Sequence, residues 1–251
     1  MERSLTSAAR NGAGKGRTET RGPTSGRDNS EMTFDLFDAL DTAEAGAPHA
    51  EPLADGAVLL HGHARPAQHE LLRDVRAVIA AAPLRHLVTP GGLSMSVAMT
   101  NCGALGWVSD RRGYRYDPID PQRGEPWPAL PESFLQLAAE AAAQAGYPGF
   151  EPDACLVNRY VPGAKLSLHQ DRDERDFGAP IVSVSLGLPA VFLFGGLKRG
   201  DPARRVALRH GDVVVWGGPS RLRFHGVLPL ADGMHALLGA ERINLTLRRA
   251  G

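Results

Sequence analysis

Three side chains in this sequence have the types and the spacing of a metal site. His169 and Asp171 are separated by one residue, so on an extended backbone both side chains project to the same face. His225 lies further along, after the apolar segment 212–216. Two neutral imidazoles and one carboxylate form the facial triad that binds non-haem Fe(II) and leaves coordination positions open. We therefore predict that His169, Asp171 and His225 are metal ligands.

The sequence also offers alternatives to this metal site. The pattern His-x-Asp occurs in polar loops that bind no metal, and other histidines could be ligands instead. His61 and His63 form a rival pair, but no acidic residue directly neighbours them, and the segment 56–60 before them predicts an edge strand. His210 precedes Gly and Asp, which predicts a residue in a hairpin turn.

The segment 242–248 could bind an anionic co-substrate. One face of this predicted strand carries Arg242, Asn244, Thr246 and Arg248, and the other carries Ile243, Leu245 and Leu247. A solvent-facing edge strand would also alternate in this way. Along a strand the two arginine Cα atoms lie roughly 20 Å apart. Side chains that lean inward leave room for a five-carbon diacid, whose carboxylates the planar guanidinium groups can pair bidentately.

A second predicted strand, 154–160, places Asn158 and Tyr160 on one face. These side chains could donate hydrogen bonds to the same carboxylates. A tyrosine in the core and an asparagine in a turn are the alternative interpretation.

The elements that must hold these residues are mainly strands. Apolar residues at helical spacing predict two helices, 67–82 and 131–145. After residue 150, short β-rich segments alternate with Gly, Pro and Asp. The segments are 154–160, 181–188, 190–194, 205–208, 212–216 and 242–248. Such spacing predicts an all-β sandwich or barrel, and the absence of a long repeat argues against a solenoid.

Composition narrows the class of function. The chain has 251 residues, of which 43% are hydrophobic and 22% charged, and its formal net charge is zero. Proteins that wrap duplex DNA are usually basic, so any contact with nucleic acid must come from local patches and must be sensitive to salt.

Localisation signals are few. No apolar run is long enough to span a membrane, and no apolar segment follows Met1, so we expect a cytoplasmic protein. Cys102 and Cys155 both lie in apolar segments, which predicts buried free thiols. Residues 1–31 are rich in Gly, Ser, Thr and Arg and predict a disordered tail. The alternatives are a transit peptide and a start of the protein at Met32.

Longer blocks of sequence resemble the AlkB family of alkylation-repair dioxygenases. The resemblance runs from Phe34 to Gly251. The segments that carry it are 89–92, 95–103, 105–107, 118–122, 158–160, 168–171, 183–187, 195–199, 210–218 and 244–246. Leu93 departs from the family pattern, where an aromatic residue is expected. Ordered blocks of this length are more specific than the triad alone.

The resemblance implies a mainly β fold with flanking helices, a double-stranded β-helix of the jelly-roll type. It implies a single domain, 32–251, with a nucleotide-recognition lid over 85–128 and a jelly-roll core over 150–251. By position, His169, Asp171 and His225 bind Fe(II). The implied 2-oxoglutarate ligands are Asn158, Tyr160, Arg242, Asn244 and Arg248, with Arg242 on the distal carboxylate and Arg248 nearer the metal.

The substrate side follows from the same resemblance. Trp107 and the ring of His169 would sandwich the damaged base, and Asp173 would contact its edge. Tyr114, Tyr116 and Arg199 would contact the substrate strand, while Thr89 and Met99 would line the pocket.

The implied reaction uses Fe(II), 2-oxoglutarate and O₂ to hydroxylate the N-alkyl group of bases such as 1-methyladenine or 3-methylcytosine. The hydroxylated group then leaves as an aldehyde and the base is restored. The substrate would be single- or double-stranded DNA, with RNA left open, and the enzyme a monomer. Two alternatives are an oxygenase of the same chemistry that acts on a protein or small molecule, and a non-catalytic binding module of the cupin type.

Overall fold

The computed structural model describes residues 49–251, so the predicted tail, 1–31, lies outside the described residues. Two helices, α2 (Gln68–Ala81) and α3 (Glu132–Gln144), occur in this part of the chain, and both confirm the sequence prediction to within a residue at each end. Their spacing of apolar residues buries one side of each helix. Neither helix has the length and apolar character that a membrane crossing requires.

Strands make up most of the remaining elements. In chain order they are β1 (Ala50–Ala54), β2 (Ala57–Leu60), β3 (Arg85–Val88), β4 (Ser94–Gly103), β5 (Gly106–Asp110), β6 (Gly113–Asp117), β7 (Ile119–Asp120), β8 (Glu125–Pro126), β9 (Ala154–Tyr160), β10 (Leu166–His169), β11 (Ile181–Gly187), β12 (Ala190–Phe194), β13 (Arg204–Leu208), β14 (Val213–Trp216), β15 (His225–Val227) and β16 (Arg242–Arg248). A short 3-10 helix, Gly218–Ser220, follows β14.

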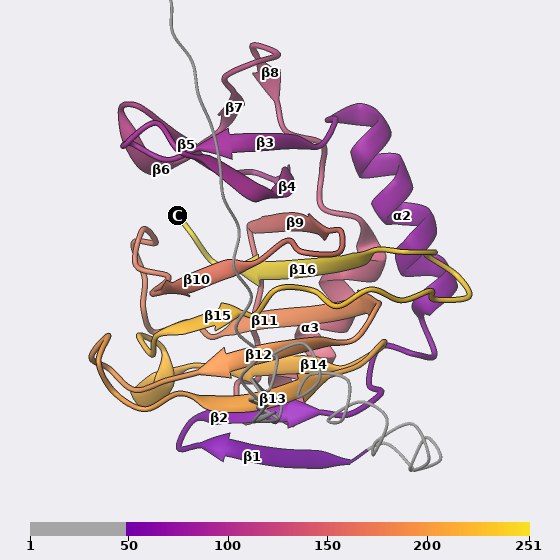
Figure 1. Ribbon diagram of the computed structural model, residues 1–251, viewed down its shortest axis with the longest axis vertical. Coiled ribbons are helices and arrows are strands. Elements are labelled where there is room, and N and C mark those ends of the chain that lie inside the picture. Colours follow the sequence, from indigo (N-terminus) through magenta and orange to yellow (C-terminus); the bar gives the residue numbers. More distant parts are fainter. Residues whose placement is uncertain (1–48) are drawn as a thin grey trace, which may run out of the picture.

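Two sheets form the body of the fold (Figure 1). The large sheet has the strand order β1-β2-β14-β11-β16-β9-β4-β3, and the smaller one has the order β10-β15-β12-β13. All neighbouring strands pair antiparallel. Strands β5 and β6 form a separate hairpin, as do β7 and β8. This sandwich confirms the mainly β fold predicted from the spacing of the strands, and it is the double-stranded β-helix that the family resemblance implies.

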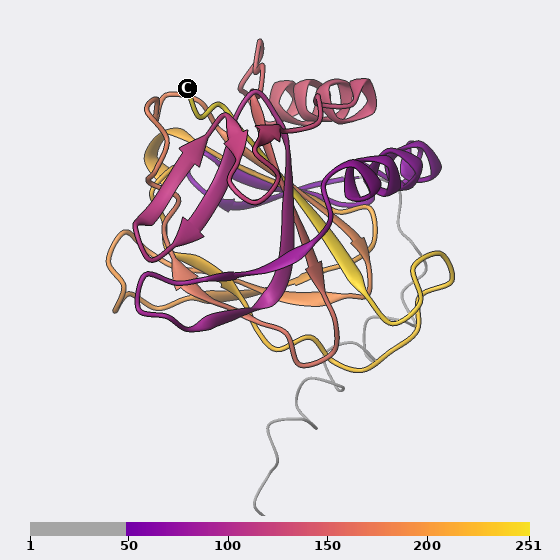
Figure 2. The ribbon, with the colours of Figure 1, turned by 90° about the horizontal axis from the view of Figure 1, so that it is seen from above.

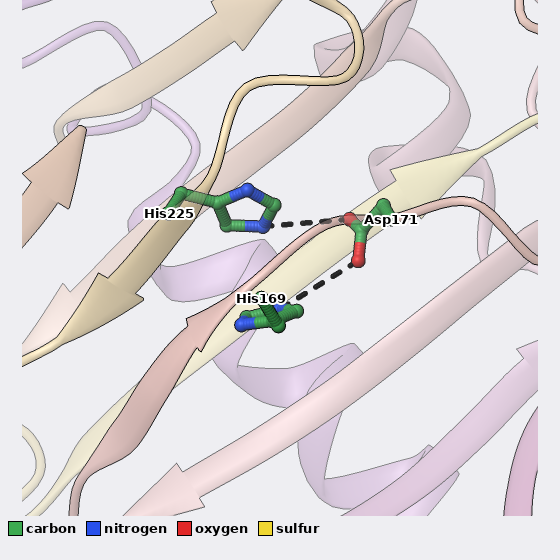
Figure 3. Close-up of side chains that lie close together, drawn as sticks. All are labelled: His169, Asp171 and His225. Atoms are coloured by element: carbon green, nitrogen blue, oxygen red, sulfur yellow. Dashed lines mark ion pairs between the residues drawn. The ribbon is translucent and has the colours of Figure 1, made fainter. Parts of the chain in front are cut away.

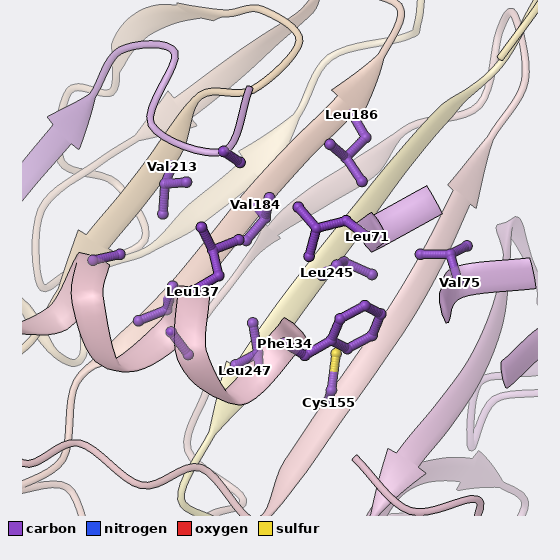
Figure 4. Packing of buried hydrophobic residues seen from close by; sticks show 14 of the residues in the cluster. Leu71, Val75, Phe134, Leu137, Cys155, Val184, Leu186, Val213, Leu245 and Leu247 are labelled. Carbon is purple, nitrogen blue, oxygen red and sulfur yellow. The ribbon is translucent and has the colours of Figure 1, made fainter. Parts of the chain in front are cut away.

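Alternation along the central strands supplies two apolar layers. Helices α2 and α3 lie side by side on one side of the molecule (Figure 2) and cover one face of the large sheet. Residues of this layer include Leu71, Val75, Phe134, Leu137, Val184, Leu245 and Leu247 (Figure 4). A second layer between the two sheets includes Phe192, Phe194, Val206, Leu208, Val214 and Trp216. Burying one such side chain stabilises the fold by about 1.5–3 kcal/mol.

Strand β16 lies in the middle of the large sheet, between β11 and β9. Its apolar residues face the helices, whereas Arg242, Asn244, Thr246 and Arg248 are buried on the other face, towards the smaller sheet. The alternative of a solvent-facing edge strand is therefore wrong for this segment. Arg242 pairs in register with Tyr160, and Asn244 pairs with Asn158, so these side chains share one face.

Two of the predictions about strands need correction. Strand β2 is not at an edge, because β1 pairs with it on one side and β14 on the other. His210 does not lie in a hairpin turn, because β13 and β14 belong to different sheets and His210 lies in the connection between them. Cys102 and Cys155 are free and buried, as predicted, and they are opposite each other on β4 and β9.

The segment 85–128 combines two kinds of structure. Strands β3 and β4 extend the large sheet, whereas the hairpins β5–β6 and β7–β8 stand outside it. The boundaries of the lid and of the single domain stay predictions.

His210 is held as a neutral ring and should make stability depend on pH. The backbone N–H of Gly187 donates to Nδ1 at 2.9 Å, so Nε2 carries the proton and lies 2.8 Å from the side-chain oxygen of Gln68. Burial, together with nearby His235, Arg65 and His69, lowers the pKa of His210 from 6.5 to about 4. The unfolded chain therefore binds more protons between these values, and folding stability falls as pH drops through this range.

We expect His210→Asn to reduce this loss of folding stability at low pH, because an amide oxygen can accept the hydrogen bond from Gly187 without titrating. Between pH 7 and pH 4, the free energy of unfolding should fall by about 1–2 kcal/mol less in the variant than in the wild type, a value that allows for solvent screening of a partly exposed ring. Denaturant unfolding at a series of pH values measures it. If the stability of the variant fell with pH as steeply as that of the wild type, His210 would not be the residue responsible.

Candidate metal and co-substrate site

The two histidines of the triad meet because β10 and β15 pair. His169 ends β10, His225 begins β15, and the two residues are opposite each other in register. Asp171 follows two residues after His169, and its carboxylate points one oxygen towards each ring (Figure 3). Nε2 of His169 lies 3.6 Å from Oδ1 of Asp171, and Nε2 of His225 lies 3.7 Å from Oδ2. One ligand atom from each residue lies within 4.8 Å of the others, so the three can share one ion.

Backbone carbonyls orient both rings. Nδ1 of His169 lies 2.9 Å from the carbonyl oxygen of Ser167, and Nδ1 of His225 lies 3.0 Å from that of Arg223. Each carbonyl accepts the Nδ1 proton, which leaves the Nε2 lone pair free and aimed at the centre. This arrangement is usual for histidines that bind metals.

The electrostatics favour the protonation states that a metal needs. Burial lowers the pKa of His225 to about 4, so its imidazole is neutral at physiological pH. Burial also acts to raise the pKa of Asp171, but Arg248 and the two histidines outweigh it and bring that pKa below its ordinary value. The neutral imidazole of His225, the carboxylate of Asp171 and a ring nitrogen of His169 therefore face one point, and this set of donors suits Fe(II).

The rival histidine pair does not form such a site. His61 lies 2.9 Å from Glu51 and 3.7 Å from Asp212, so the structure corrects the expectation that it has no acidic neighbour. His63 joins no metal-ligating cluster, and burial lowers its pKa. Within residues 49–251, the triad is the one group of three such side chains that could hold an ion.

The triad opens into a cavity of about 800 Å³. The 2-oxoglutarate ligands predicted from the sequence line it, namely Asn158, Tyr160, Arg242, Asn244 and Arg248. Six of the seven residues predicted on the substrate side also line it, namely Thr89, Met99, Trp107, Tyr114, Asp173 and Arg199. The structure thus brings these predicted residues together in one space, while the role of each stays a prediction.

Arg242 has the hydrogen-bonding capacity that a bound carboxylate would use. Its guanidinium is buried, lies 5.0 Å from the ring centre of Tyr160, and donates from Nη2 to the hydroxyl of Ser185 at 3.0 Å. Nε and Nη1 are buried without a partner. A buried cation with free donors is costly unless an anion pairs with it. The site therefore fits one carboxylate of 2-oxoglutarate at Arg242.

The guanidinium of Arg248 already pairs with two carboxylates. Its Nε and Nη2 donate to Oδ2 of Asp171 at 2.9 and 2.6 Å, and Nε lies 3.3 Å from Glu174. It lies beside the metal ligands, at the end of β16 where the resemblance places it. Its primary contact, however, is the carboxylate of the metal ligand, so the two arginines are not equivalent ends of a clamp.

Asn158 and Asn244 are joined to each other. The amide of Asn158 donates to Oδ1 of Asn244 at 3.2 Å, and the amide of Asn244 donates to Ser183 and to the carbonyl of Val184. The side-chain oxygen of Asn158 has no partner. These bonds fix the polar wall of the cavity before any ligand arrives, which reduces the entropy cost of binding.

Tyr116 is the predicted substrate residue that lies elsewhere. It does not line the cavity, and its hydroxyl donates to Glu174 at 2.8 Å. The prediction that it contacts the substrate strand is untested.

Sequence reasoning missed Glu174 and Arg221. Both are buried, and Arg221 donates to the backbone oxygen of Asp171 at 2.8 Å. The acidic and basic run 171–175 resembles an exposed loop, and a buried glutamate in it gives no periodic signal.

Residues 56–248 match the family model described as the 2OG-Fe(II) oxygenase superfamily. The β sandwich and the His-Asp-His triad define the same class of protein.

Individual relatives narrow this assignment. The chain is 61% identical over 212 residues to the alpha-ketoglutarate-dependent dioxygenase AlkB of Escherichia coli strain K12, which covers 84% of this chain and 98% of the relative. It is 49% identical over 185 residues to the AlkB homolog of Caulobacter vibrioides strain NA1000, covering 73% and 82%. The solved structure of OsALKBH1 aligns with a TM-score of 0.71 and 31% identity, over 80% of this chain and all of that one. The chain belongs to the AlkB family of the 2OG-Fe(II) oxygenase superfamily and is an Fe(II)- and 2-oxoglutarate-dependent dioxygenase.

Proposed function

We propose that this dioxygenase removes alkyl groups from the nitrogen atoms of nucleic-acid bases such as 1-methyladenine and 3-methylcytosine. The observation that carries the proposal is the wall of the cavity above the triad. Trp107 and Tyr114 stack there with ring centres 5.5 Å apart, and Nε1 of Trp107 donates to Asp173 at 2.8 Å. Alkylation at these nitrogens leaves the base positively charged and unable to pair. An aromatic face beside a carboxylate attracts such a ring.

The rim of the cavity suits a strand of nucleic acid. Lys165, Arg172 and Arg199 line it, and all three are exposed. Side chains of this kind bind phosphate groups and would position the strand without selecting its sequence. A damaged base already fails to pair, so moving it from the stack into the cavity costs less than moving an intact base.

The residues of the cavity would have separate roles in the reaction. His169, Asp171 and His225 would hold Fe(II), and Arg242 would anchor 2-oxoglutarate. Arg248 keeps the Asp171 carboxylate ionised and fixed, and Trp107 with Asp173 would place the alkyl group towards the triad. When bound, Fe(II) with 2-oxoglutarate and O₂ supplies the oxidation of the alkyl carbon, and the products are succinate, CO₂, an aldehyde and the restored base.

Mass spectrometry of a methylated oligonucleotide tests the proposal directly. After incubation with Fe(II), 2-oxoglutarate and O₂, we expect the oligonucleotide to lose the mass of one methylene per lesion. Parallel reactions with single-stranded DNA, duplex DNA and RNA rank the substrates. If only free amino acids or peptides stimulated succinate release, the alternative of a protein or small-molecule oxygenase would replace this one. The predictions of a monomer and of a cytoplasmic location are open to sedimentation and fractionation.

Trp107→Ala should weaken binding of the methylated oligonucleotide by about 1–3 kcal/mol, because it removes the stacking face. Slow succinate formation without oligonucleotide should survive, since Trp107 lies on the substrate side of the cavity. Fluorescence anisotropy measures the binding, and Trp107→Phe, which keeps a ring, should lose less. Loss of both binding and substrate-free succinate formation would mean that Trp107 supports the structure instead.

A further inference from the structure

Two adjacent acids fasten the β5–β6 hairpin to the segment that follows the metal ligand. Asp173 accepts a hydrogen bond from Nε1 of Trp107, and Glu174 accepts one from the hydroxyl of Tyr116, each at 2.8 Å. Trp107 and Tyr116 are opposite each other in the hairpin, so their side chains share one face. The hairpin that carries the stacking tryptophan is thus held at two neighbouring points.

The two bonds differ in burial. Asp173 is exposed at the cavity, where the proposed function requires it to face the edge of the base. Its bond to Trp107 is therefore open to competition from a base. The side chain of Glu174 is only 2% exposed, so its bond to Tyr116 persists when Asp173 turns to substrate. Burial, with smaller effects from the neighbouring charges, raises the pKa of Tyr116, so its hydroxyl remains a donor.

Glu174 also contacts both arginines that hold the metal ligand. Its Oε1 lies 3.3 Å from Nε of Arg248, and its Oε2 lies 3.1 Å from Nη2 of Arg221. Arg248 binds the carboxylate of Asp171, and Arg221 binds its backbone oxygen. The cluster is balanced, with two acids and two arginines, so each buried charge has a partner.

We propose that Glu174 is a positioning residue that ties the substrate-binding hairpin to the iron ligand Asp171. The proposal rests on the proposed function, because it assigns the hairpin to substrate. The hydrogen bond from Tyr116 to Glu174 keeps Trp107 in a fixed position relative to the triad while a base enters the cavity. If the hairpin drifts, the alkyl group no longer reaches the oxidising centre, and 2-oxoglutarate is consumed without repair. The ratio of repaired base to succinate therefore reports on this bond.

Tyr116→Phe is the sharpest test, because it removes one hydroxyl and keeps the ring. We expect the KM for methylated oligonucleotide to rise about three- to tenfold, as for the loss of one hydrogen bond. The ratio of repaired base to succinate should fall by a similar factor, while the KM for 2-oxoglutarate stays at the wild-type value. Tyr147→Phe is the matched control, since its hydroxyl also donates one bond at 2.8 Å, to the carbonyl of Gly56, and neither residue lines the cavity. This control should leave both the KM for methylated oligonucleotide and the ratio of repaired base to succinate at their wild-type values.

Glu174→Gln extends the test to the metal side. It keeps the shape of the side chain but leaves the two arginines with one acid, so it should also raise the KM for 2-oxoglutarate. In the double variant with Tyr116→Phe, the effects on the repair ratio should be less than additive. Full additivity, or a wild-type repair ratio in Tyr116→Phe, would overturn the proposal, and the latter outcome does not depend on whether Glu174→Gln folds.

Hydrogen exchange provides a readout without activity. Amides of residues 106–117 should exchange several times faster in Tyr116→Phe than in the wild type or in Tyr147→Phe. Unchanged exchange would overturn the proposal. If the wild type repairs no methylated oligonucleotide but exchange still accelerates, the substrate assignment fails and the bond between hairpin and metal segment stands.

Discussion

His169→Ala, Asp171→Ala and His225→Ala should each abolish turnover. Each removes one of three ligand atoms that lie within 4.8 Å of one another, and no other described side chain of a ligating type lies within that group. A bound metal lowers the barrier of its reaction by several kcal/mol, so we expect a loss of at least about 10³-fold. Succinate release and repair of a methylated oligonucleotide, measured in metal-controlled buffer, should both disappear.

The three variants should differ in stability, which separates ligation from folding. His169 is one-third exposed, so its loss costs little. Asp171 neutralises Arg248 in the interior, and its removal leaves that arginine with Glu174 alone, at a cost of about 3–5 kcal/mol. His69→Ala, on the exposed side of α2, is the control and should keep full turnover. Retained repair by any triad variant would contradict the ligand assignment.

Local periodicity was sufficient to predict the helices and the central strands. In β16, the alternation of charged and apolar residues is complete, and the structure places it between β11 and β9 with both faces buried. What the pattern could not decide was whether the polar face meets solvent or an interior cavity. That depends on the smaller sheet, whose strand β12 comes from a distant part of the chain.

Strands β10 and β15 escaped prediction although they carry two of the three metal ligands. They have four and three residues, and their sequences, LSLH and HGV, lack a periodic pattern of useful length. Their pairing with each other brings His169 opposite His225 across a long separation in sequence. The spacing of His169 and Asp171 is local and predictable, whereas the third ligand depends on long-range register.

The buried network behind the triad could not be predicted for a different reason. Glu174, Arg221 and Arg248 are charged residues that composition places at the surface. Only their mutual pairing in three dimensions makes burial acceptable, and that pairing joins three separate segments. Likewise, the two arginines of β16 look equivalent in sequence, but the structure gives Arg248 two acidic partners and surrounds Arg242 with neutral ones, Ser185 and Tyr160.

This asymmetry makes Arg242 the residue whose loss should most affect use of 2-oxoglutarate. Two of its donors, Nε and Nη1, are buried without partners and would meet the carboxylate of the co-substrate. Removing one partner of a buried ion pair costs about 3–5 kcal/mol, so Arg242→Ala should raise the Kd for 2-oxoglutarate by roughly 10²–10³-fold or more. Calorimetric titration of 2-oxoglutarate under anaerobic conditions, with a redox-inert divalent metal bound, measures this directly.

Arg242→Lys should recover part of the affinity, because an ammonium keeps the charge but cannot reproduce the planar fork. The affinity for the metal should stay at the wild-type value in both variants, since Arg242 contacts Ser185 and Tyr160 rather than the triad. Arg205→Ala, on the exposed side of β13, is the matched control. An unchanged Kd in Arg242→Ala would mean that the co-substrate lies elsewhere, and loss of metal binding would mean that the two ends of β16 are not independent. The free donors of Arg242 predict a weaker Kd, and its contacts with Ser185 and Tyr160 predict unchanged metal binding.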